Sequence, residues 1–274
     1  MNIDKLATVA KETVSICDAG KYETSCGKQV VIADAIKTAV KGTVMYSPEN
    51  LPPVPGLGAL VETNIEVAKE TTFRGLARLA ARGGHVACLN FASARKPGGG
   101  FLGGAPAQEE ALARASALYP CLLAAPEYYE RNRANRSAIY LDLMIYSPQV
   151  PFFRNDGGDL LEKPTLASVL TAPAPNRGAV AHNERRNLSL VEAALRRRAE
   201  MILHIAQAHR VDGLVLGAWG CGVFRNDPGQ VASIFAALLK PPGRFAGVFR
   251  EVLFSIYDRA EPPLTLRAFA DALK

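Results

Sequence analysis

Residues 90–110 have the sequence NFASARKPGGGFLGGAPAQEE, in which five of the seven residues 98–104 are glycine. An apolar run at residues 85–91 predicts a buried strand before this loop, and Gln108 begins a helix predicted to reach about Leu118. Without side chains, the loop's N–H groups can approach an anion closely, and the helix N-terminus adds partial positive charge. The unit therefore predicts a phosphate-binding loop, although glycine content alone is equally typical of a flexible turn.

A second glycine loop, GAWGCGVFRNDP, occupies residues 217–228. It follows a predicted buried strand at residues 214–216 and precedes a helix that Asp227 and Pro228 begin with a cap and a first-position proline. Two such loops in one sheet suit a pyrophosphate, with one loop on each phosphate. The aromatic side chains Phe101 and Phe224 would then be available to pack against a sugar or a base.

Three other motifs in these loops are weaker. Gly98, Gly100 and Gly103 satisfy G-x-G-x-x-G, but six residues separate the strand from the first glycine, which disfavours a Rossmann turn. No G-x-x-x-x-G-K-[ST] sequence is present, which disfavours a P-loop nucleotidase. Cys221 lies between two glycines like a nucleophile, but no histidine has a sequence relation to it.

Glu109 and Glu110 begin the helix after the first loop. Adjacent helical residues point about 100° apart, so the two acids cannot flank a scissile bond as an ordinary glycosidase pair does. The geometry allows one acid to transfer a proton while the other binds a sugar hydroxyl. A solvated pair that interacts with the helix dipole is the structural alternative.

The rest of the chain alternates between predicted strands and helices, which indicates one α/β domain. The predicted strands are 29–32, 43–46, 61–68, 138–146, 165–171, 214–216 and 248–257, and the predicted helices are 4–17, 71–81, 183–209, 228–239 and 263–273. Residues 126–136 are predicted to form a loop. We expect residues 1–58 to be an accessory extension and residues 59–274 to be the catalytic domain.

Composition excludes several classes of protein. The chain has 274 residues, of which 49% are hydrophobic, and it has a net charge of +6 and five scattered cysteines without a C-x-x-C pair. Disorder, a fibre and a disulfide framework are disfavoured, and no apolar stretch reaches the roughly 18 residues of a membrane span. No secretory signal is visible, so a cytoplasmic location is expected. Arg196, Arg197 and Arg198 fan across about 200° of a helix and are expected to be solvated.

The triple glycine Gly98–Gly100, followed after seven residues by Gln108-Glu109-Glu110, resembles the signature of poly(ADP-ribose) glycohydrolases. Residues 90–94, 145–148, 172–176 and 217–224 look like the microbial-type members, so the resemblance covers roughly residues 60–257. It implies an α/β, macrodomain-like three-layer fold, with a mixed central sheet between helices and ADP-ribose in a cleft at one end of the sheet.

The resemblance also implies residue roles. Glu110 would be the catalytic acid/base, and Glu109 would bind the ribose next to the scissile bond. Gln108 would orient the acids or the substrate, Asn90 would lie at the terminal ribose, and Phe224 would pack near a ribose. The diphosphate would be enclosed by Gly98, Gly99 and Gly100 on one side and by Gly220, Cys221, Gly222, Val223 and Phe224 on the other, and Phe101 would be a further substrate-binding residue.

The implied activity is hydrolysis of ribose–ribose O-glycosidic bonds in poly(ADP-ribose), of exo type, which releases ADP-ribose. A mono-ADP-ribosyl hydrolase acting on protein or nucleic acid and a noncatalytic ADP-ribose reader are the alternatives. No cofactor and no metal are expected, because no ligand set such as H-E-x-x-H occurs. The expected partners are poly(ADP-ribose) or ADP-ribosylated proteins, without a membrane or direct nucleic-acid binding, and a monomer is favoured.

Overall fold

The computed structural model describes residues 2–56 and 61–274. Its helices are α1 (Ile3–Ala19), α2 (Ala33–Lys41), α3 (Thr72–Ala81), η1 (Phe101–Gly103), α4 (Gln108–Ala115), α5 (Leu118–Leu123), α6 (Pro126–Ala134), α7 (Arg177–Asn183), η2 (Arg185–Asn187), α8 (Leu190–Ala208), α9 (Pro228–Leu239) and α10 (Leu264–Leu273). Its strands are β1 (Lys21–Glu23), β2 (Gln29–Val31), β3 (Val44–Tyr46), β4 (Asn64–Ala68), β5 (Val86–Phe91), β6 (Met144–Arg154), β7 (Leu160–Ala172), β8 (Gly213–Leu216) and β9 (Glu251–Ser255).

The central sheet has seven strands in the order β3-β6-β7-β5-β8-β9-β4. Strands β7, β5, β8, β9 and β4 are mutually parallel, whereas β6 pairs antiparallel with both β3 and β7. The carboxyl ends of four neighbouring parallel strands, β7, β5, β8 and β9, therefore meet at one edge. In open α/β sheets this edge is where ligands bind.

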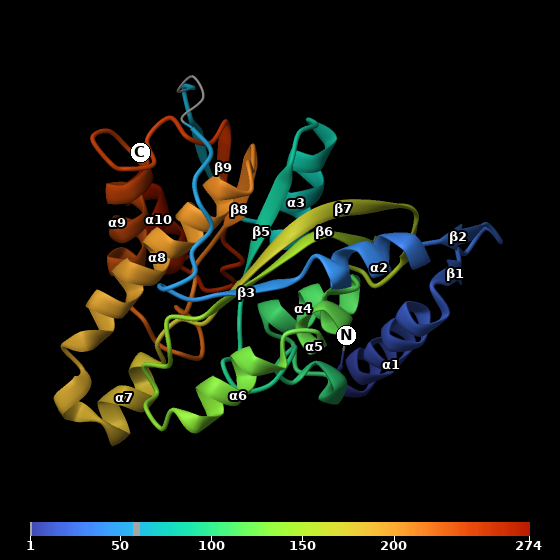
Figure 1. Cartoon of the computed structure of the whole chain (residues 1–274), viewed down its shortest axis with the longest axis horizontal. Helices are drawn as coiled ribbons and strands as arrows, with labels where there is room; N and C mark the ends of the chain where they lie inside the picture. Colours follow the sequence, from blue (N-terminus) through green and yellow to red (C-terminus); the bar gives the residue numbers. More distant parts are fainter. Residues whose placement is uncertain (1, 57–60) are drawn as a thin grey trace.

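Strand β5 shows why helices cover both faces of the sheet. Its buried residues alternate, with Ala87 and Leu89 in one hydrophobic cluster and Val86 and Cys88 in the other. Helices α8, α9 and α10 lie on one side of the sheet, and α1, α2, α3 and α5 lie on the other (Figure 1). The mixed sheet between two helical layers confirms the predicted macrodomain-like fold.

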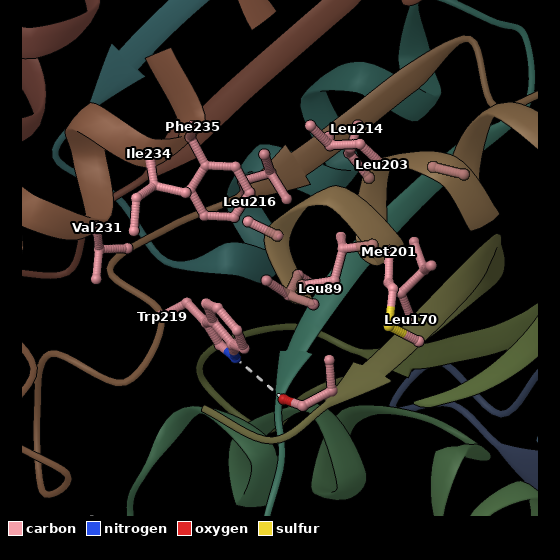
Figure 2. Packing of buried hydrophobic residues seen from close by; sticks show 14 of the residues in the cluster. Leu89, Leu170, Met201, Leu203, Leu214, Leu216, Trp219, Val231, Ile234 and Phe235 are labelled. Atoms are coloured by element: carbon pink, nitrogen blue, oxygen red, sulfur yellow. Dashed lines mark hydrogen bonds between the residues drawn. The ribbon is translucent and has the colours of Figure 1, made fainter. Parts of the chain in front are cut away.

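The cluster on the α8 and α9 side extends into the second glycine loop through Trp219. Leu89 and Leu216 of the sheet and Phe235 of α9 belong to this cluster, and Trp219 lies at its border (Figure 2). The indole Nε1–H of Trp219 donates to the carbonyl of Ala172 at 3.0 Å, which ties the loop to the end of β7. The loop after β8 is thus fixed by the core at its base.

The N-terminal segments pack against the rest of the chain in several places, including α2 against β6. Strand β3 pairs with β6 and forms an edge of the central sheet, while α1 packs against η1 and α4. The predicted boundary between residues 58 and 59 lies outside the described residues, so the division into extension and catalytic domain stays a prediction.

Several predicted elements need correction. Residues 126–136 do not form a loop: α6 occupies most of them and buries Tyr128, Tyr129 and Asn132. The strand predicted at 138–146 begins at Met144 and continues to Arg154. The predicted helix 183–209 corresponds to two separate elements, η2 and α8, and the elements α2, α5, α7 and β1 were not predicted.

Across residues 2–56 and 61–274, no helix combines the length and the apolar character that crossing a membrane requires.

Candidate active site

A cavity of about 980 Å³ lies at the carboxyl ends of the parallel strands. Segments after β5, β8 and β9 line it, together with the first turns of α3 and α4 and residues from α1. Among the residues predicted for the site, those that line the cavity are Gly99, Gly100, Gln108, Glu109, Glu110, Gly220, Cys221, Gly222, Val223 and Phe224. The structure thus brings both glycine loops and both acids around one space.

The first glycine loop lies directly against the acid pair. Gly99 has φ +59°, and a Cβ atom at this position would collide with Oε1 of Glu110 and come within 3.0 Å of Oε2 of Glu109. The backbone N–H of Gly100 donates to Oε1 of Glu110 at 2.8 Å. Glycine is therefore required at position 99 for both the backbone conformation and the close approach of the carboxylates.

Glu109 is held from two sides. The backbone N–H of Ser93 donates to its Oε2 at 2.7 Å, and Nδ2 of Asn90 donates to its Oε1 at 3.3 Å. Burial raises the pKa of Glu109 to about 8, and the neighbouring charge of Glu110 adds to this rise against the two hydrogen bonds. At neutral pH the raised pKa favours the protonated form of Glu109.

Asn90 lies beneath Glu109 and does not line the cavity. Its side chain is fully buried, and Nδ2 also lies 3.2 Å from Oγ1 of Thr171. Its Oδ1 has no hydrogen-bond partner among the described residues. In this structure Asn90 contacts Glu109, and its expected place at the terminal ribose stays a prediction.

Gln108 connects helix α4 to strand β5. Its Oε1 accepts from the backbone N–H of Phe91 at 2.9 Å, and its Nε2 donates to the carbonyl of Leu89 at 2.8 Å and to Oγ1 of Thr72 at 3.1 Å. These bonds fix the start of the helix that bears both acids. The arrangement supports the orienting role implied by the resemblance.

Two predicted substrate contacts in the first loop do not reach the cavity. Phe101 is 1% exposed and packs against Tyr119, with ring centroids 5.1 Å apart, and against Ala10 of α1. Gly98 is buried, with φ +65°, and a Cβ atom there would lie 3.3 Å from Phe101 and Tyr119. The expectation that Phe101 packs on a sugar or base is corrected, because α1 covers this side of the loop.

The second loop is shaped by Gly220 and Asn226. Gly220 has φ +74°, and a Cβ atom there would collide with Ala174. Nδ2 of Asn226 donates to the carbonyls of Pro175 at 2.9 Å and Gly220 at 3.1 Å. Burial raises the pKa of the Cys221 thiol to about 12, so this cysteine is not a thiolate nucleophile at neutral pH.

Aromatic side chains form one wall of the cavity. The rings of Phe224 and Tyr140 lie 6.0 Å apart, and the guanidinium of Arg95 lies 5.9 Å from the Tyr140 ring centroid. Tyr140 has φ +63°. Tyr140 has no sequence signal that links it to the site, because it belongs to a distant segment that tertiary packing brings to the loop.

Arg198 donates hydrogen bonds to the backbone that forms this wall. It was expected to be solvated, and this expectation is wrong. Its side chain is fully buried, and it donates to Asp142 at 2.7 Å and to the carbonyls of Pro173, Ile139 and Tyr140 at 2.9, 2.7 and 3.0 Å. The neighbouring Arg197 does remain exposed. Arg198 therefore holds the backbone beside Tyr140 and just before Ala174, which contacts the second loop.

Ser93 and Arg114 are two further site residues that sequence reasoning missed. Oγ of Ser93 accepts from the backbone N–H groups of Arg95 and Lys96 at 3.2 and 3.1 Å, which shapes the loop after β5. Arg114, one turn after Glu110, is buried and donates to the carbonyl of Ala105 at 2.7 Å. A serine between a predicted strand and a glycine-rich loop is a weak sequence signal for the role of Ser93. No sequence signal indicates the role of Arg114.

In the described ranges, no group of three or more His, Cys, Asp or Glu side chains is arranged to hold a metal ion. The two carboxylates line the cavity together with the glycine loops and with polar side chains such as Ser93, Arg95 and Lys96. A carboxylate pair beside loops suited to a diphosphate, at the carboxyl edge of a macrodomain-like sheet, defines the class of ADP-ribose-directed glycosidases.

Comparison with known proteins specifies the family. Residues 10–155 match the family model of the microbial-type PARG catalytic domain. The structure of poly(ADP-ribose) glycohydrolase from Thermomonospora curvata is 46% identical, with a TM-score of 0.92 over 98% of this chain and 99% of that chain. This chain belongs to the microbial-type poly(ADP-ribose) glycohydrolase family.

Two ligand complexes are also similar. The Thermomonospora curvata enzyme bound to the inhibitor ADP-HPD is 48% identical, with a TM-score of 0.91 over 98% of this chain and 99% of that one. The Deinococcus radiodurans enzyme in complex with ADP-ribose is 46% identical, with a TM-score of 0.81 over 87% and 97%. No functionally curated protein sequence gives a significant match.

Proposed function

We propose that this protein hydrolyses the ribose–ribose O-glycosidic bonds of poly(ADP-ribose), with Glu110 as the acid/base. The observation that supports this role most directly is the contact between the first glycine loop and the acid pair. Glu110 is 8% exposed, and its Oε1 faces the N–H of Gly100 at 2.8 Å. The carboxylate therefore lies where a diphosphate-binding loop meets the helix N-terminus.

The reaction needs one proton to be delivered and one to be taken back. Glu110 protonates the ribose oxygen that leaves as the C–O bond breaks, and an oxocarbenium-like centre develops at the anomeric carbon. Glu110 then takes a proton from the water that attacks this carbon. Such acid–base catalysis contributes typically ~10²–10⁴-fold.

Glu109 is suited to binding rather than to proton delivery. Both of its oxygens already accept hydrogen bonds from Ser93 and Asn90, so the carboxylate has a fixed orientation. A carboxyl group in this position can accept from or donate to a ribose hydroxyl next to the scissile bond. Its raised pKa favours the protonated carboxyl near neutral pH, and this form can donate a hydrogen bond to that hydroxyl.

The two loops supply the binding site for the diphosphate. Gly99 and Gly100 line one side of the cavity and Gly220 to Phe224 line the other, where Phe224 also packs with Tyr140. A phosphate that accepts from the loop N–H groups would place its charge near the developing cation. Substrate binding and transition-state stabilisation then use the same loops.

Exo-type cleavage is supported by helix α1. Leu6 and Val9 of α1 line the cavity, and α1 packs against η1 and α4 next to the glycine loop. A helix in this place limits how a polymer can continue through the cavity on that side. We infer that the enzyme binds the polymer end and releases ADP-ribose.

The test is release of ADP-ribose by the wild-type protein and by Glu110→Gln, with poly(ADP-ribose) and a mono-ADP-ribosylated protein as parallel substrates. We expect the wild type to act on the polymer and Glu110→Gln to lose at least about 10²-fold in turnover while retaining ADP-ribose affinity within about three-fold. Release from the mono-modified protein alone would assign the rival hydrolase activity. Binding without any release would assign a noncatalytic reader.

Further properties stay proposals. The protein partners are ADP-ribosylated proteins as carriers of the polymer, the protein is a monomer, and its location is cytoplasmic.

A further inference from the structure

Five exposed cations surround the mouth of the cavity, and they come from four segments. Arg95 and Lys96 follow β5, Arg133 is in α6, Arg177 begins α7, and Arg225 follows the second glycine loop. Arg95 and Lys96 also line the cavity. We refer to these five residues as the basic rim.

Direct contacts join the members of the basic rim. Nη1 of Arg133 donates to the carbonyl of Arg95 at 3.0 Å, and Arg95 lies over the ring of Tyr140, which packs against Phe224. The rim is therefore continuous from α6 to the second loop.

A second set of contacts extends the rim to α7. The backbone N–H of Gly178 donates to the carbonyl of Phe224 at 3.0 Å, and Cδ of Arg225 lies 3.1 Å from the place of a Cβ atom on Gly178. Arg177, the residue before Gly178, therefore lies close to Arg225. α6 and α7 lie at the same end of the molecule, beyond the lower end of β5 (Figure 1).

The charges of the basic rim are not neutralised by ion pairs. Within residues 2–56 and 61–274, none of the five cations has a carboxylate oxygen within 4.0 Å, whereas the nearby Arg131 pairs with Glu127. Glu184 is the acid whose charge interacts with Arg95, but its oxygens already accept from Ser137, the N–H of Ala138 and Asn187. The rim thus presents excess positive charge to solvent.

We propose that the basic rim binds phosphates of poly(ADP-ribose) units that lie outside the cavity. This inference rests on the proposed function, since it concerns the part of the polymer that is not being cleaved. Exposed Arg and Lys bind a flexible polyanion by releasing counterions, so the affinity falls with salt, with a log–log slope of about −0.7 for each neutralised phosphate. Free ADP-ribose fills the cavity and gains no contact with Arg133, Arg177 or Arg225, which do not line it.

The rim would have a consequence for turnover. A polymer end is attracted by the cavity and the rim together, whereas the released product is held by the cavity alone. The rim therefore favours exchange of product for a new polymer end, and this preference weakens at high salt.

The test uses Glu110→Gln as the background, so that labelled poly(ADP-ribose) can be bound without cleavage. The rim variant is Arg133→Gln/Arg177→Gln/Arg225→Gln, and none of these three residues lines the cavity. A charge-matched control, Lys28→Gln/Lys163→Gln/Arg210→Gln, removes three exposed cations away from the cavity. A third variant replaces the three rim arginines with lysine and keeps the charge.

We expect the rim variant to bind polymer about ten-fold more weakly near 0.1 M salt, and to lower the slope of log affinity against log salt by about 2. Its affinity for ADP-ribose stays within about two-fold. The lysine variant retains most of the polymer affinity, and the control retains all of it.

Two results would overturn the proposal: an unchanged salt slope in the rim variant, or an equal loss in the charge-matched control. If the protein binds an oligonucleotide with the same number of phosphates as tightly as it binds poly(ADP-ribose), the assignment of the rim to poly(ADP-ribose) is overturned. Release of ADP-ribose by the wild type is measured separately. Failure of the proposed function is thereby distinguished from failure of the rim.

Discussion

The N–H of Gly100 donates to Oε1 of Glu110 over 2.8 Å, so the first glycine loop and helix α4 meet at the carboxylate proposed to transfer the proton. The loop therefore determines the position of Glu110 as well as binding substrate. A change in the loop backbone should alter catalysis even when no acid is replaced.

Gly99→Ala is expected to lower kcat by at least ten-fold. The added Cβ would collide with Glu110 and disfavour the φ of +59°, at a cost on the order of 1 kcal/mol in backbone strain alone. Steady-state release of ADP-ribose measures the loss. Gly103→Ala is the matched control, since Gly103 has no positive φ and no atom within 4 Å of its Cβ position. Equal activity of the two variants would contradict the assigned geometry.

Glu109→Gln should change how stability depends on pH. An ordinary glutamate titrates near 4.5 and Glu109 near 8, so the folded state binds more protons between these values. The contribution of Glu109 to stability is present below about pH 4.5 and is lost as pH rises through 8. We therefore expect the Tm of Glu109→Gln to rise relative to the Tm of the wild type as the pH is raised from about 5 to about 9, by on the order of 5 °C. Parallel Tm curves would refute the raised pKa.

Phe224→Ala should weaken both binding and turnover. Its ring packs 6.0 Å from Tyr140 in the cavity wall, and an aromatic pair contributes about 0.5–1.5 kcal/mol beyond burial. We expect the Kd for ADP-ribose to rise about ten-fold, measured by calorimetry, with Phe224→Tyr retaining most of the affinity. If Phe224→Ala binds and turns over as the wild type does, the second loop does not contact the substrate.

Arg198→Lys should destabilise the protein and raise KM. Lysine keeps the charge but cannot reproduce the four bonds to Asp142 and to the carbonyls of Pro173, Ile139 and Tyr140, so the wall beside Tyr140 loses its support. Thermal unfolding should show a loss of several degrees, with KM rising more than kcat falls.

Arg197→Lys is the control for this variant, because Arg197 pairs with the same Asp142 but its side chain is 57% exposed. Exposed pairs contribute roughly 0–1 kcal/mol. Similar effects of the two substitutions would mean that burial of Arg198 has no role in shaping the wall.

The elements with strong local patterns could be predicted from the sequence. Helix α9 has its Asp227 cap and first-position proline, and β5 begins with the four apolar residues 86–89. Helix α6 was missed because it buries few residues, so its sequence lacks an apolar stripe. The proline that marked it as a loop, Pro126, in fact occupies its first turn.

Strand β6 was misplaced because two prolines suggested a break. Pro148 falls at a register shift between Ser147 and Val150, and Pro151 pairs with Leu166 of β7. Strand β3 pairs only with residues 144–146, so the later part of β6 is an edge, where a strand tolerates proline. This tolerance depends on pairing, which local sequence does not reveal.

Some residues of the site could likewise be predicted from the sequence, and others could not. The glycines and acids of residues 98–110 are contiguous, so their spacing predicts that they act together. Tyr140 and Arg198 reach the site through tertiary structure, whereas Ser93 belongs to the same stretch as the first loop but is a residue type that is common elsewhere. Phe101 was misassigned because proximity in sequence to the loop does not show which side of the loop α1 covers.

Trp219 gives the protein a built-in optical probe. It is the single tryptophan of the chain, and its buried indole is hydrogen-bonded at the base of the loop that lines the cavity. Fluorescence excited at the indole band therefore originates from one known place. Movement of the loop as substrate arrives or product leaves can be followed in the unlabelled protein, in real time and without introducing a dye near the site.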